Sequence, residues 1–405
     1  MKHVIIGGGA AALSAAATLR REDPTGHVTV MFKESVNPYP KMALPYLLTG
    51  KIEEKDFFLT PPTGVDLLPG EEAVRIHAER RQVETARGQT YPYDLLLIAS
   101  GASPEKPKIP GGDLPFVFTV RDLPDIIGIR THIKGRTGRA VIAGAGPVGM
   151  EIGDALCELG MSVTFVVASN RVFSAMLDVP AAEWLAGKLR GQGIEILTGE
   201  EIVSIRKNGE VALRSGGTRT CDLVIFGKGV KPDIPFLAGS GIATVQGIVV
   251  NEKQETNVPG IFGAGDAVQS RDIVSGEMRV NALWPVALEQ GRVAALNMAG
   301  LSAIYPGSLT RNILRVFGVS VFVAGAGRAG RGYEIRTADG PDFYRKIVMD
   351  QGTLKGLIFL GEVRNEGFYS NLIGRNADVS DYVESLLKGS YGYARHLARV
   401  CHQAA

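Results

Sequence analysis

Two similar stretches of sequence decide the fold of this chain, HVIIGGGAAA at residues 3–12 and AVIAGAGPVG at residues 140–149. Each begins as an apolar run typical of a buried strand and ends in closely spaced glycines. A helix-like segment and a second apolar run follow each stretch, VTVMF at residues 28–32 and SVTFVV at residues 162–167. A strand, a glycine turn, a helix and a second strand form a βαβ unit, so the chain carries one internal repeat.

The first glycine turn has the spacing of a dinucleotide-binding turn, with Gly7, Gly9 and Ala12 at the three small positions. The first glycine makes the tight turn, the second lets a pyrophosphate approach the backbone, and the third small residue lets the helix pack closely. The pyrophosphate then lies at the helix N-terminus. Glu34 comes just after the second strand, where a carboxylate would accept hydrogen bonds from ribose hydroxyls.

The second glycine turn, formed by Gly144, Gly146 and Gly149, lacks the matching acid because Val167 stands in its place. Without an acid NADP is not repelled, and Arg171 could either pair with a 2′-phosphate or be a solvated surface charge. No arginine directly follows the strand, so the sequence favours NAD and leaves NADP open. Two dinucleotide sites in one chain imply FAD and NAD(P)H with hydride transfer between them. The alternative, one working site and one degenerate copy, is disfavoured by the complete second set of glycines.

The bulk composition narrows the class of protein. The chain has 405 residues, 45% hydrophobic and 21% charged, with a net charge of +2, which favours neither nucleic acid nor a membrane surface as partner. The first strand is predicted to begin close to Met1, so we expect no signal peptide, and no apolar run is long enough to span a bilayer. Cys157, Cys221 and Cys401 are far apart in the sequence and form no metal-ligand spacing, so we expect no metal site and a cytoplasmic location with free thiols.

The remaining segments complete a domain prediction. LLLI at residues 95–98 and LVIF at residues 223–226 are continuously apolar, as in buried parallel strands, and a small antiparallel meander is expected around residues 82–91. After residue 305 the pattern changes to alternating strands with a final helix from about Ser380. We predict an α/β fold with two Rossmann-like domains and a C-terminal α+β domain. The FAD domain covers 1–113 and 246–304, the NAD(P) domain 114–245 and the C-terminal domain 305–405.

With these motifs the chain resembles the pyridine nucleotide–disulfide oxidoreductase superfamily, through residues 7–12, 95–101, 144–151, 227–232 and 256–266. The resemblance assigns Asp266 to the ribityl chain of FAD. It places Leu283 and Trp284, at a helix N-terminus, against the flavin pyrimidine ring, where the helix dipole would stabilise negative charge on the reduced flavin. A core aromatic is the alternative for Trp284. Glu151 would lie near the nicotinamide carboxamide, with a surface helix glutamate as its alternative. Further cofactor contacts are implied at Ala11, Val74, Ser100, Gly101, Val148, Gly229 and Gly265.

The segment PYPKMALPYLLTG at residues 38–50 and the stretch 282–300 are most similar to the NADH:rubredoxin reductases and the flavin domain of assimilatory nitrite reductase. Lys41 stands where that branch usually has arginine and would keep a positive charge near the flavin, so Lys41 and Glu151 are the predicted catalytic residues. Met42 occupies the place of the redox cysteine found in the coenzyme A-disulfide reductases. A thioether cannot form a thiolate, which argues against disulfide chemistry.

The resulting prediction is an FAD-dependent NAD(P)H:acceptor oxidoreductase that exchanges electrons with a small iron–sulfur or rubredoxin-type protein. Such contacts are small and often steered by charge, and a basic tail with Lys388, Arg395 and Arg399 could meet an acidic partner. Two alternatives are kept, an NADH oxidase that reduces oxygen directly and a non-enzymatic FAD-binding partner protein. The sequence leaves a homodimer open.

Overall fold

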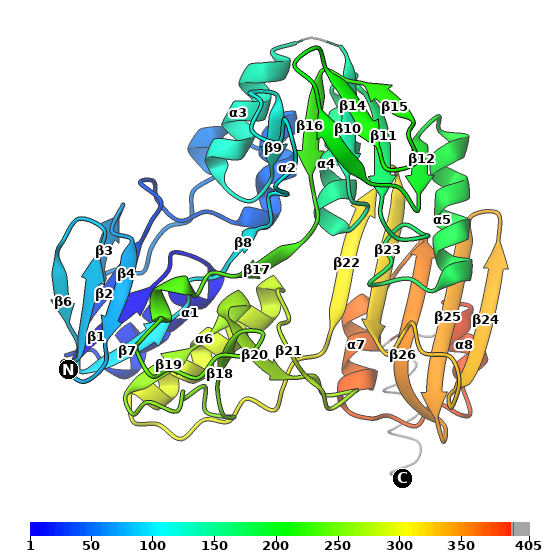
Figure 1. The fold of residues 1–405 in the computed structure, drawn as a ribbon. Helices are drawn as coiled ribbons and strands as arrows, with labels where there is room; N and C mark the ends of the chain where they lie inside the picture. Colours follow the sequence, from blue (N-terminus) through cyan, green and yellow to red (C-terminus); the bar gives the residue numbers. More distant parts are fainter. Residues whose placement is uncertain (136, 390–391, 393–405) are drawn as a thin grey trace. The chain divides into compact units, whose positions relative to one another are not determined.

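The computed structural model describes residues 1–135, 137–389 and 392, and its course is drawn in Figure 1. The chain forms two compact units. The first unit contains residues 1–103 and 230–308, and the second contains residues 104–229 and the chain from 309 onward. The second unit thus includes residues 114–229 of the predicted NAD(P) domain and nearly all of the predicted C-terminal domain, whereas residues 230–245 lie in the first unit. The separation of these two domains remains a prediction. Arg395, Arg399 and Cys401 lie outside the described residues.

The first unit is built on a five-stranded parallel sheet in the order β3-β2-β1-β7-β19. Its strands are β1 (Lys2–Ile6), β2 (His27–Phe32), β3 (Asp66–Pro69), β7 (Leu95–Ile98) and β19 (Ile261–Gly263). The helices of this unit are α1 (Ala10–Glu22), α2 (Leu44–Thr49) and α6 (Trp284–Met298). The smaller strands are β4 (Ala73–His77), β5 (Gln82–Thr85), β6 (Thr90–Pro92), β8 (Ala102–Pro104), β17 (Val230–Pro232), β18 (Ile248–Val249), β20 (Val268–Arg271) and β21 (Met278–Arg279).

Alternation along β1 divides the core of this unit into two layers. Ile5 packs in one apolar cluster with α1 and α6, whereas Val4 and Ile6 pack in the other cluster, with the meander β4-β5-β6. Successive side chains of a strand point to opposite faces, so β1 is buried on both sides as its apolar run predicts. The predicted meander around residues 82–91 is confirmed.

Helices α1 and α6 lie side by side, and Gly291 explains how closely they approach. A Cβ at this position would stand 2.2 Å from the carbonyl oxygen of Ala11, closer than any real contact. Only glycine therefore lets α6 pack against the backbone of α1. The hydroxyl of Ser14 adds a hydrogen bond to the Leu288 carbonyl, 2.8 Å long.

The second unit contains a parallel sheet in the order β12-β11-β10-β16-β9. Its elements are β9 (Val117–Thr119), α3 (Leu123–Ile133), β10 (Arg139–Ala143), α4 (Pro147–Glu158), β11 (Ser162–Val167), α5 (Val179–Gly191), β12 (Glu195–Thr198) and β16 (Leu223–Phe226), with a second meander of β13 (Ile202–Ile205), β14 (Glu210–Leu213) and β15 (Thr218–Thr220). In both sheets the strand that leads into a glycine turn, β1 or β10, is central and lies between the next strand of the repeat and a later apolar strand. The internal repeat and the α/β class are confirmed.

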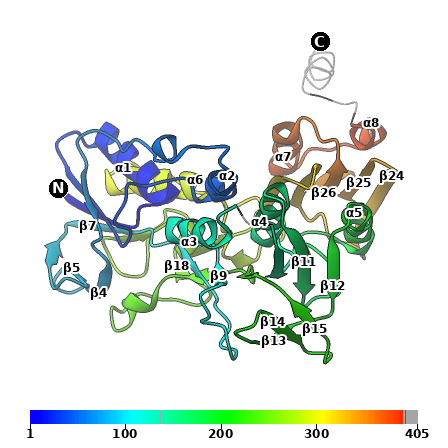
Figure 2. The same cartoon turned by 90° about the horizontal axis from the view of Figure 1, so that it is seen from above.

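An antiparallel sheet in the order β22-β23-β26-β25-β24 completes the second unit. Its elements are β22 (Arg311–Val316), β23 (Val319–Gly325), β24 (Glu334–Gly340), β25 (Phe343–Asp350), β26 (Thr353–Gly361), α7 (Glu366–Gly374) and α8 (Val383–Leu387). Figure 2 shows α7 and α8 on the side of this sheet opposite to α5. The central strands are therefore buried on both faces. No helix of the described residues is long and apolar enough to cross a membrane.

Candidate functional site

The first glycine turn leaves the N-terminus of α1 open. Gly7 has a φ of +121°, and a Cβ there would lie 2.0 Å from the carbonyl oxygen of Ala99 at the end of β7. Gly9 is the N-cap of α1, no side chain caps the helix, and a Cβ on Gly9 would meet nothing within 4 Å. The first backbone N–H groups of the helix thus have no side-chain cap, and their partial positive charge suits a pyrophosphate.

The second glycine turn repeats this geometry. Gly144 has a φ of +111° and faces the carbonyl oxygen of Gly227, while Gly146 is the uncapped N-cap of α4 with open space around it. A Cβ on Gly149 would stand 2.3 Å from the Gly144 carbonyl oxygen, so the third position requires glycine. The residues of both turns fit dinucleotide pyrophosphates, with a tight first position, an open second position and a small third one.

Glu34 and Lys41, both predicted to serve FAD, contact each other. The Lys41 ammonium lies 2.8 Å from Oε1 of Glu34, and the Tyr39 hydroxyl donates to Oε2 of the same carboxylate. The Lys41 Nζ also lies 5.7 Å from the centre of the Tyr39 ring. The adjacent Met42 is 56% exposed. The segment after β2 thus contains a carboxylate, Glu34, that is hydrogen-bonded by Lys41 and Tyr39, and beside it the exposed thioether of Met42.

Four further predicted cofactor contacts lie in the loops after β7 and β16 and on β4. The Ser100 hydroxyl, two residues after the end of β7, is buried, and no group of the described residues hydrogen-bonds it. A buried hydroxyl without a partner is what a bound ligand could satisfy. Gly101 follows it, and Gly229 occupies the equivalent region after β16 with open space around it. Val74 on β4 is 41% exposed.

The remaining predicted FAD contacts lie at the start of α6 and in a short turn after β19. The turn Gly265–Ala267 carries Asp266, and α6 begins at Trp284 with Leu283 as an N-cap that has no side-chain cap. Trp284 is partly buried against the apolar cluster around α1, so it packs in the core while its backbone forms the helix N-terminus. Ala11 and Ala12 are buried in the same cluster.

Sequence reasoning missed Gln290, which links these two elements. Its side-chain oxygen accepts a 2.8 Å hydrogen bond from the Gly265 amide, and the side chain is almost fully buried. The available signal was a polar residue on the buried face of α6, where Val286, Ala287, Val293 and Ala294 are apolar.

Glu151, the fifth residue of α4, is the most perturbed acid of the nicotinamide region. Burial, and then the charge of Asp154, raise the pKa of Glu151 to about 7. Val148, one residue after the start of the same helix, is 41% exposed. The structure thus brings Gly146, Val148 and Glu151 together at one helix N-terminus. Glu151 is partly buried, and its placement near a nicotinamide carboxamide remains a prediction.

Arg171 is engaged by its own loop. Its guanidinium donates to the carbonyl oxygens of Leu177 and Ser174, at 3.2 and 3.1 Å, and to the side chain of Asn170 at 3.0 Å. Val167, where an acid was expected, is buried at the end of β11.

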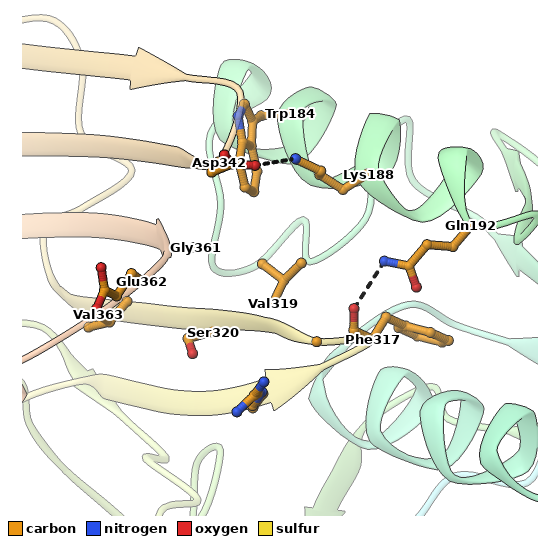
Figure 3. Close-up of a pocket in the computed structure, with 12 residues that line it drawn as sticks. Trp184, Lys188, Gln192, Phe317, Val319, Ser320, Asp342, Gly361, Glu362 and Val363 are labelled. Atoms are coloured by element: carbon orange, nitrogen blue, oxygen red, sulfur yellow. Dashed lines mark hydrogen bonds and ion pairs between the residues drawn. The ribbon is translucent and has the colours of Figure 1, made fainter.

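A separate cavity of about 570 Å³ lies between α5 and one end of the antiparallel sheet (Figure 3). Lys188 points to Asp342 and Gln192 to the Phe317 carbonyl, at 3.1 Å each. None of the predicted cofactor contacts lines this cavity. In the part of the chain that the structure describes, no histidine, cysteine and carboxylate side chains gather into a metal site.

Comparisons with known proteins agree with this geometry. Residues 1–291 match the family model described as pyridine nucleotide-disulphide oxidoreductase. The chain is 32% identical to the NADH-dependent phenylglyoxylate dehydrogenase subunit epsilon of Aromatoleum evansii, over 94% of this chain and 93% of that protein. It is 29% identical to the 3-phenylpropionate/cinnamic acid dioxygenase ferredoxin–NAD(+) reductase component of Photorhabdus laumondii, over 75% and 79% of the two chains. Its fold matches the structure of an NAD-dependent persulfide reductase from A. fulgidus with a TM-score of 0.88 and 26% identity, over 95% and 79% of the chains.

The family match covers more than half of the chain and both glycine turns, and the most extensive of these relatives spans nearly all of it. The resemblance predicted from the sequence is therefore confirmed. This chain belongs to the pyridine nucleotide-disulphide oxidoreductase family and is an NAD(P)H-dependent oxidoreductase.

Proposed function

We propose that this protein is an FAD-dependent NADH oxidoreductase that exchanges electrons with a small iron–sulfur or rubredoxin-type protein. The observation that carries the proposal is the repeated glycine turn, in which Gly9 and Gly146 each leave an uncapped helix N-terminus open. One open turn would suit a single nucleotide. Two turns of matching geometry suit a flavin and a nicotinamide, because transfer between these two cofactors is the usual reason to pair such sites.

The first unit supplies the proposed FAD contacts. The N-terminus of α1 would bind the pyrophosphate, Glu34 the adenosine ribose, and the Ser100 hydroxyl would gain a polar partner. Asp266 would hold the ribityl chain, and the N-terminus of α6 would stabilise negative charge at the pyrimidine edge. When bound, FAD supplies two-electron chemistry with nicotinamide and electron transfer to an acceptor.

The second unit supplies the proposed nicotinamide contacts. Burial, and then the charge of Asp154, raise the pKa of Glu151 to about 7, so its protonated form, which can donate a hydrogen bond to a carboxamide oxygen, is available near neutral pH. NAD is favoured over NADP because the guanidinium of Arg171 already donates to three acceptors in its own loop. Binding a 2′-phosphate through Arg171 would require these hydrogen bonds to break.

The electron acceptor is argued from chemistry near the proposed flavin. Met42 occupies the place where a redox cysteine would stand, and a thioether cannot form the thiolate that disulfide exchange needs. Among the relatives, one is named as a ferredoxin–NAD(+) reductase component and another as a subunit of an NADH-dependent dehydrogenase, which supports a protein acceptor. The persulfide reductase of similar fold marks sulfur chemistry as the principal alternative.

Anaerobic stopped-flow measurements test the proposal. The purified protein should contain FAD, NADH should reduce it faster than NADPH, and rubredoxin or a small ferredoxin should then reoxidise it. Reoxidation by oxygen alone at the full turnover rate would favour an NADH oxidase, and selective reoxidation by coenzyme A persulfide would favour the sulfur alternative. A bound flavin that NADH does not reduce would favour the non-enzymatic partner protein.

Two further features complete the proposal. Scattered cysteines suit a reducing compartment, so we expect the protein in the cytoplasm, which cell fractionation tests. Sedimentation analysis of the purified protein distinguishes a monomer from a homodimer, which the sequence leaves open.

A further inference from the structure

Gln290 is a buried polar residue in the middle of α6, only 1% exposed, and both ends of its amide are used. Oε1 accepts a hydrogen bond from the Gly265 amide at 2.8 Å, and Nε2 donates to the Ser270 hydroxyl at 3.1 Å. A backbone N–H can only donate, so the side-chain oxygen must face Gly265 and the orientation of the amide is fixed.

These hydrogen bonds connect two elements that are proposed to touch the flavin. Gly265 begins the turn that carries Asp266, and α6 begins at Trp284. Trp284 precedes Gln290 by fewer than two helical turns, about 9 Å along the axis. One side chain therefore sets the position of the Asp266 turn relative to the N-terminus of α6.

The network continues beyond Gln290 and anchors it. The Ser270 hydroxyl lies 2.9 Å from that of Ser308, which lies 2.9 Å from the Tyr305 hydroxyl. Ser270 and Ser308 are 5% and 1% exposed, so water cannot replace a lost partner without a rearrangement. Removing the amide would cost the Gly265 N–H and the Ser270 hydroxyl one hydrogen bond each. Because these groups are buried, this loss destabilises the protein more than the loss of an exposed hydrogen bond would.

We propose that Gln290 is a positioning residue for the flavin: it holds the Asp266 turn in register with the N-terminus of α6. The inference rests on the proposed binding of FAD. Gln290 does not itself contact the cofactor in this proposal, and its role goes beyond packing in the core. Its removal therefore affects FAD binding and the flavin spectrum more than its effect on stability would predict.

Asn297 provides a matched control on the same helix. Its side chain donates to the carbonyl oxygens of Lys253 and Ala303, at 2.9 and 2.8 Å, and accepts from the Ala303 amide at 3.0 Å. These contacts tie down the C-terminal end of α6, away from the Gly265 turn. Asn297→Leu thus removes a comparable set of hydrogen bonds without touching the proposed flavin elements.

The test compares Gln290→Leu with Asn297→Leu by flavin fluorescence titration, the absorbance spectrum of bound FAD and thermal unfolding of the apoprotein. Both variants should lower Tm. Gln290→Leu should weaken FAD binding at least tenfold and shift the flavin absorbance, whereas Asn297→Leu should stay within twofold of wild type with an unchanged spectrum. Equal FAD affinity in the two variants would overturn the proposal and leave Gln290 a packing residue.

Gln290→Glu keeps the test decisive if Gln290→Leu does not fold. The protonated carboxyl reproduces both hydrogen bonds of the amide, accepting from Gly265 and donating to Ser270. The carboxylate would instead reverse the hydroxyl chain and place a charge at a buried position, which is costly. FAD affinity of this variant relative to wild type should therefore recover as the pH falls. A ratio that is independent of pH would contradict the positioning role. Absence of FAD from the wild-type protein would instead refute the proposed function.

Discussion

The ammonium group of Lys41 lies 2.8 Å from a carboxylate oxygen of Glu34. The two side chains are 27% and 21% exposed, so the ion pair is only partly screened by water. The Tyr39 hydroxyl donates to the other oxygen of Glu34, which fixes the carboxylate from two sides. Lys41 therefore orients the acid proposed to bind the adenosine ribose, and this contact supports its cofactor-binding role.

A double-mutant cycle on Lys41 and Glu34 tests this relationship. We expect Lys41→Gln and Glu34→Gln each to weaken FAD binding several-fold, and the double variant to lose less than the sum, with a coupling of about 0.5–1 kcal/mol. Lys41→Arg, which keeps the charge, is the control and should stay near wild type. FAD titration gives the affinities. If the two losses of FAD affinity are additive and the flavin of FAD-saturated Lys41→Gln is reduced slowly, Lys41 instead acts in hydride transfer.

Gly146→Val should separate nicotinamide binding from folding. A Cβ at Gly146 meets nothing within 4 Å, so we expect the free protein to tolerate the valine and its side chain to enter the space proposed for the pyrophosphate. The variant should keep its FAD and its Tm and lose flavin reduction by NADH. Gly149→Ala is the contrasting control, because its Cβ would stand 2.3 Å from the Gly144 carbonyl oxygen and should destabilise the protein by about 1–3 kcal/mol. Normal flavin reduction in Gly146→Val would show that NADH binds elsewhere.

Glu151 should make stability depend on pH. Burial and Asp154 raise the pKa of Glu151 from 4.5 to about 7, so the folded protein holds a proton that the unfolded chain releases at lower pH. This contribution to the free energy of unfolding is fully present below pH 4.5 and falls as the pH rises to 7, by about 2–3 kcal/mol. Glu151→Gln should remove this pH-dependent loss. Compared with wild type, the free energy of unfolding of the variant, measured by urea unfolding, should therefore be higher at pH 8 than at pH 5. Glu158→Gln, at an exposed position of the same helix, is the control and should show the same pH dependence as wild type.

The parts of the fold that the sequence predicted are those set by local pattern. Gly7 and Gly144 are required by their own backbone geometry, and apolar runs such as residues 95–98 are buried whatever follows them. The pairing of Gln290 with Gly265 was not predicted because it joins residues 25 positions apart through the packing of α6. The sequence does not show whether Arg171 binds a phosphate, because the three oxygen acceptors of its guanidinium come together only when its loop is folded.

Cysteine chemistry provides the last prediction, that no thiol takes part in turnover. Burial, and then the charge of Asp154, raise the pKa of Cys157 to about 11, and burial, followed by the charge of Asp222, raises that of Cys221 to about 11. At pH 7.5 fewer than about one in a thousand of either thiol is therefore the reactive thiolate. Met42 offers no thiol beside the proposed flavin.

A variant with Cys157, Cys221 and Cys401 all replaced by alanine should keep its NADH:acceptor rate, with some loss of Tm where Cys221 packs in the core. Titration of the wild-type protein with dithionite should reduce the flavin without a long-wavelength thiolate–flavin band. The appearance of that band, or a folded triple variant that binds both cofactors but cannot pass electrons on, would restore the disulfide-reductase mechanism and point first to Cys401, which lies outside the described residues.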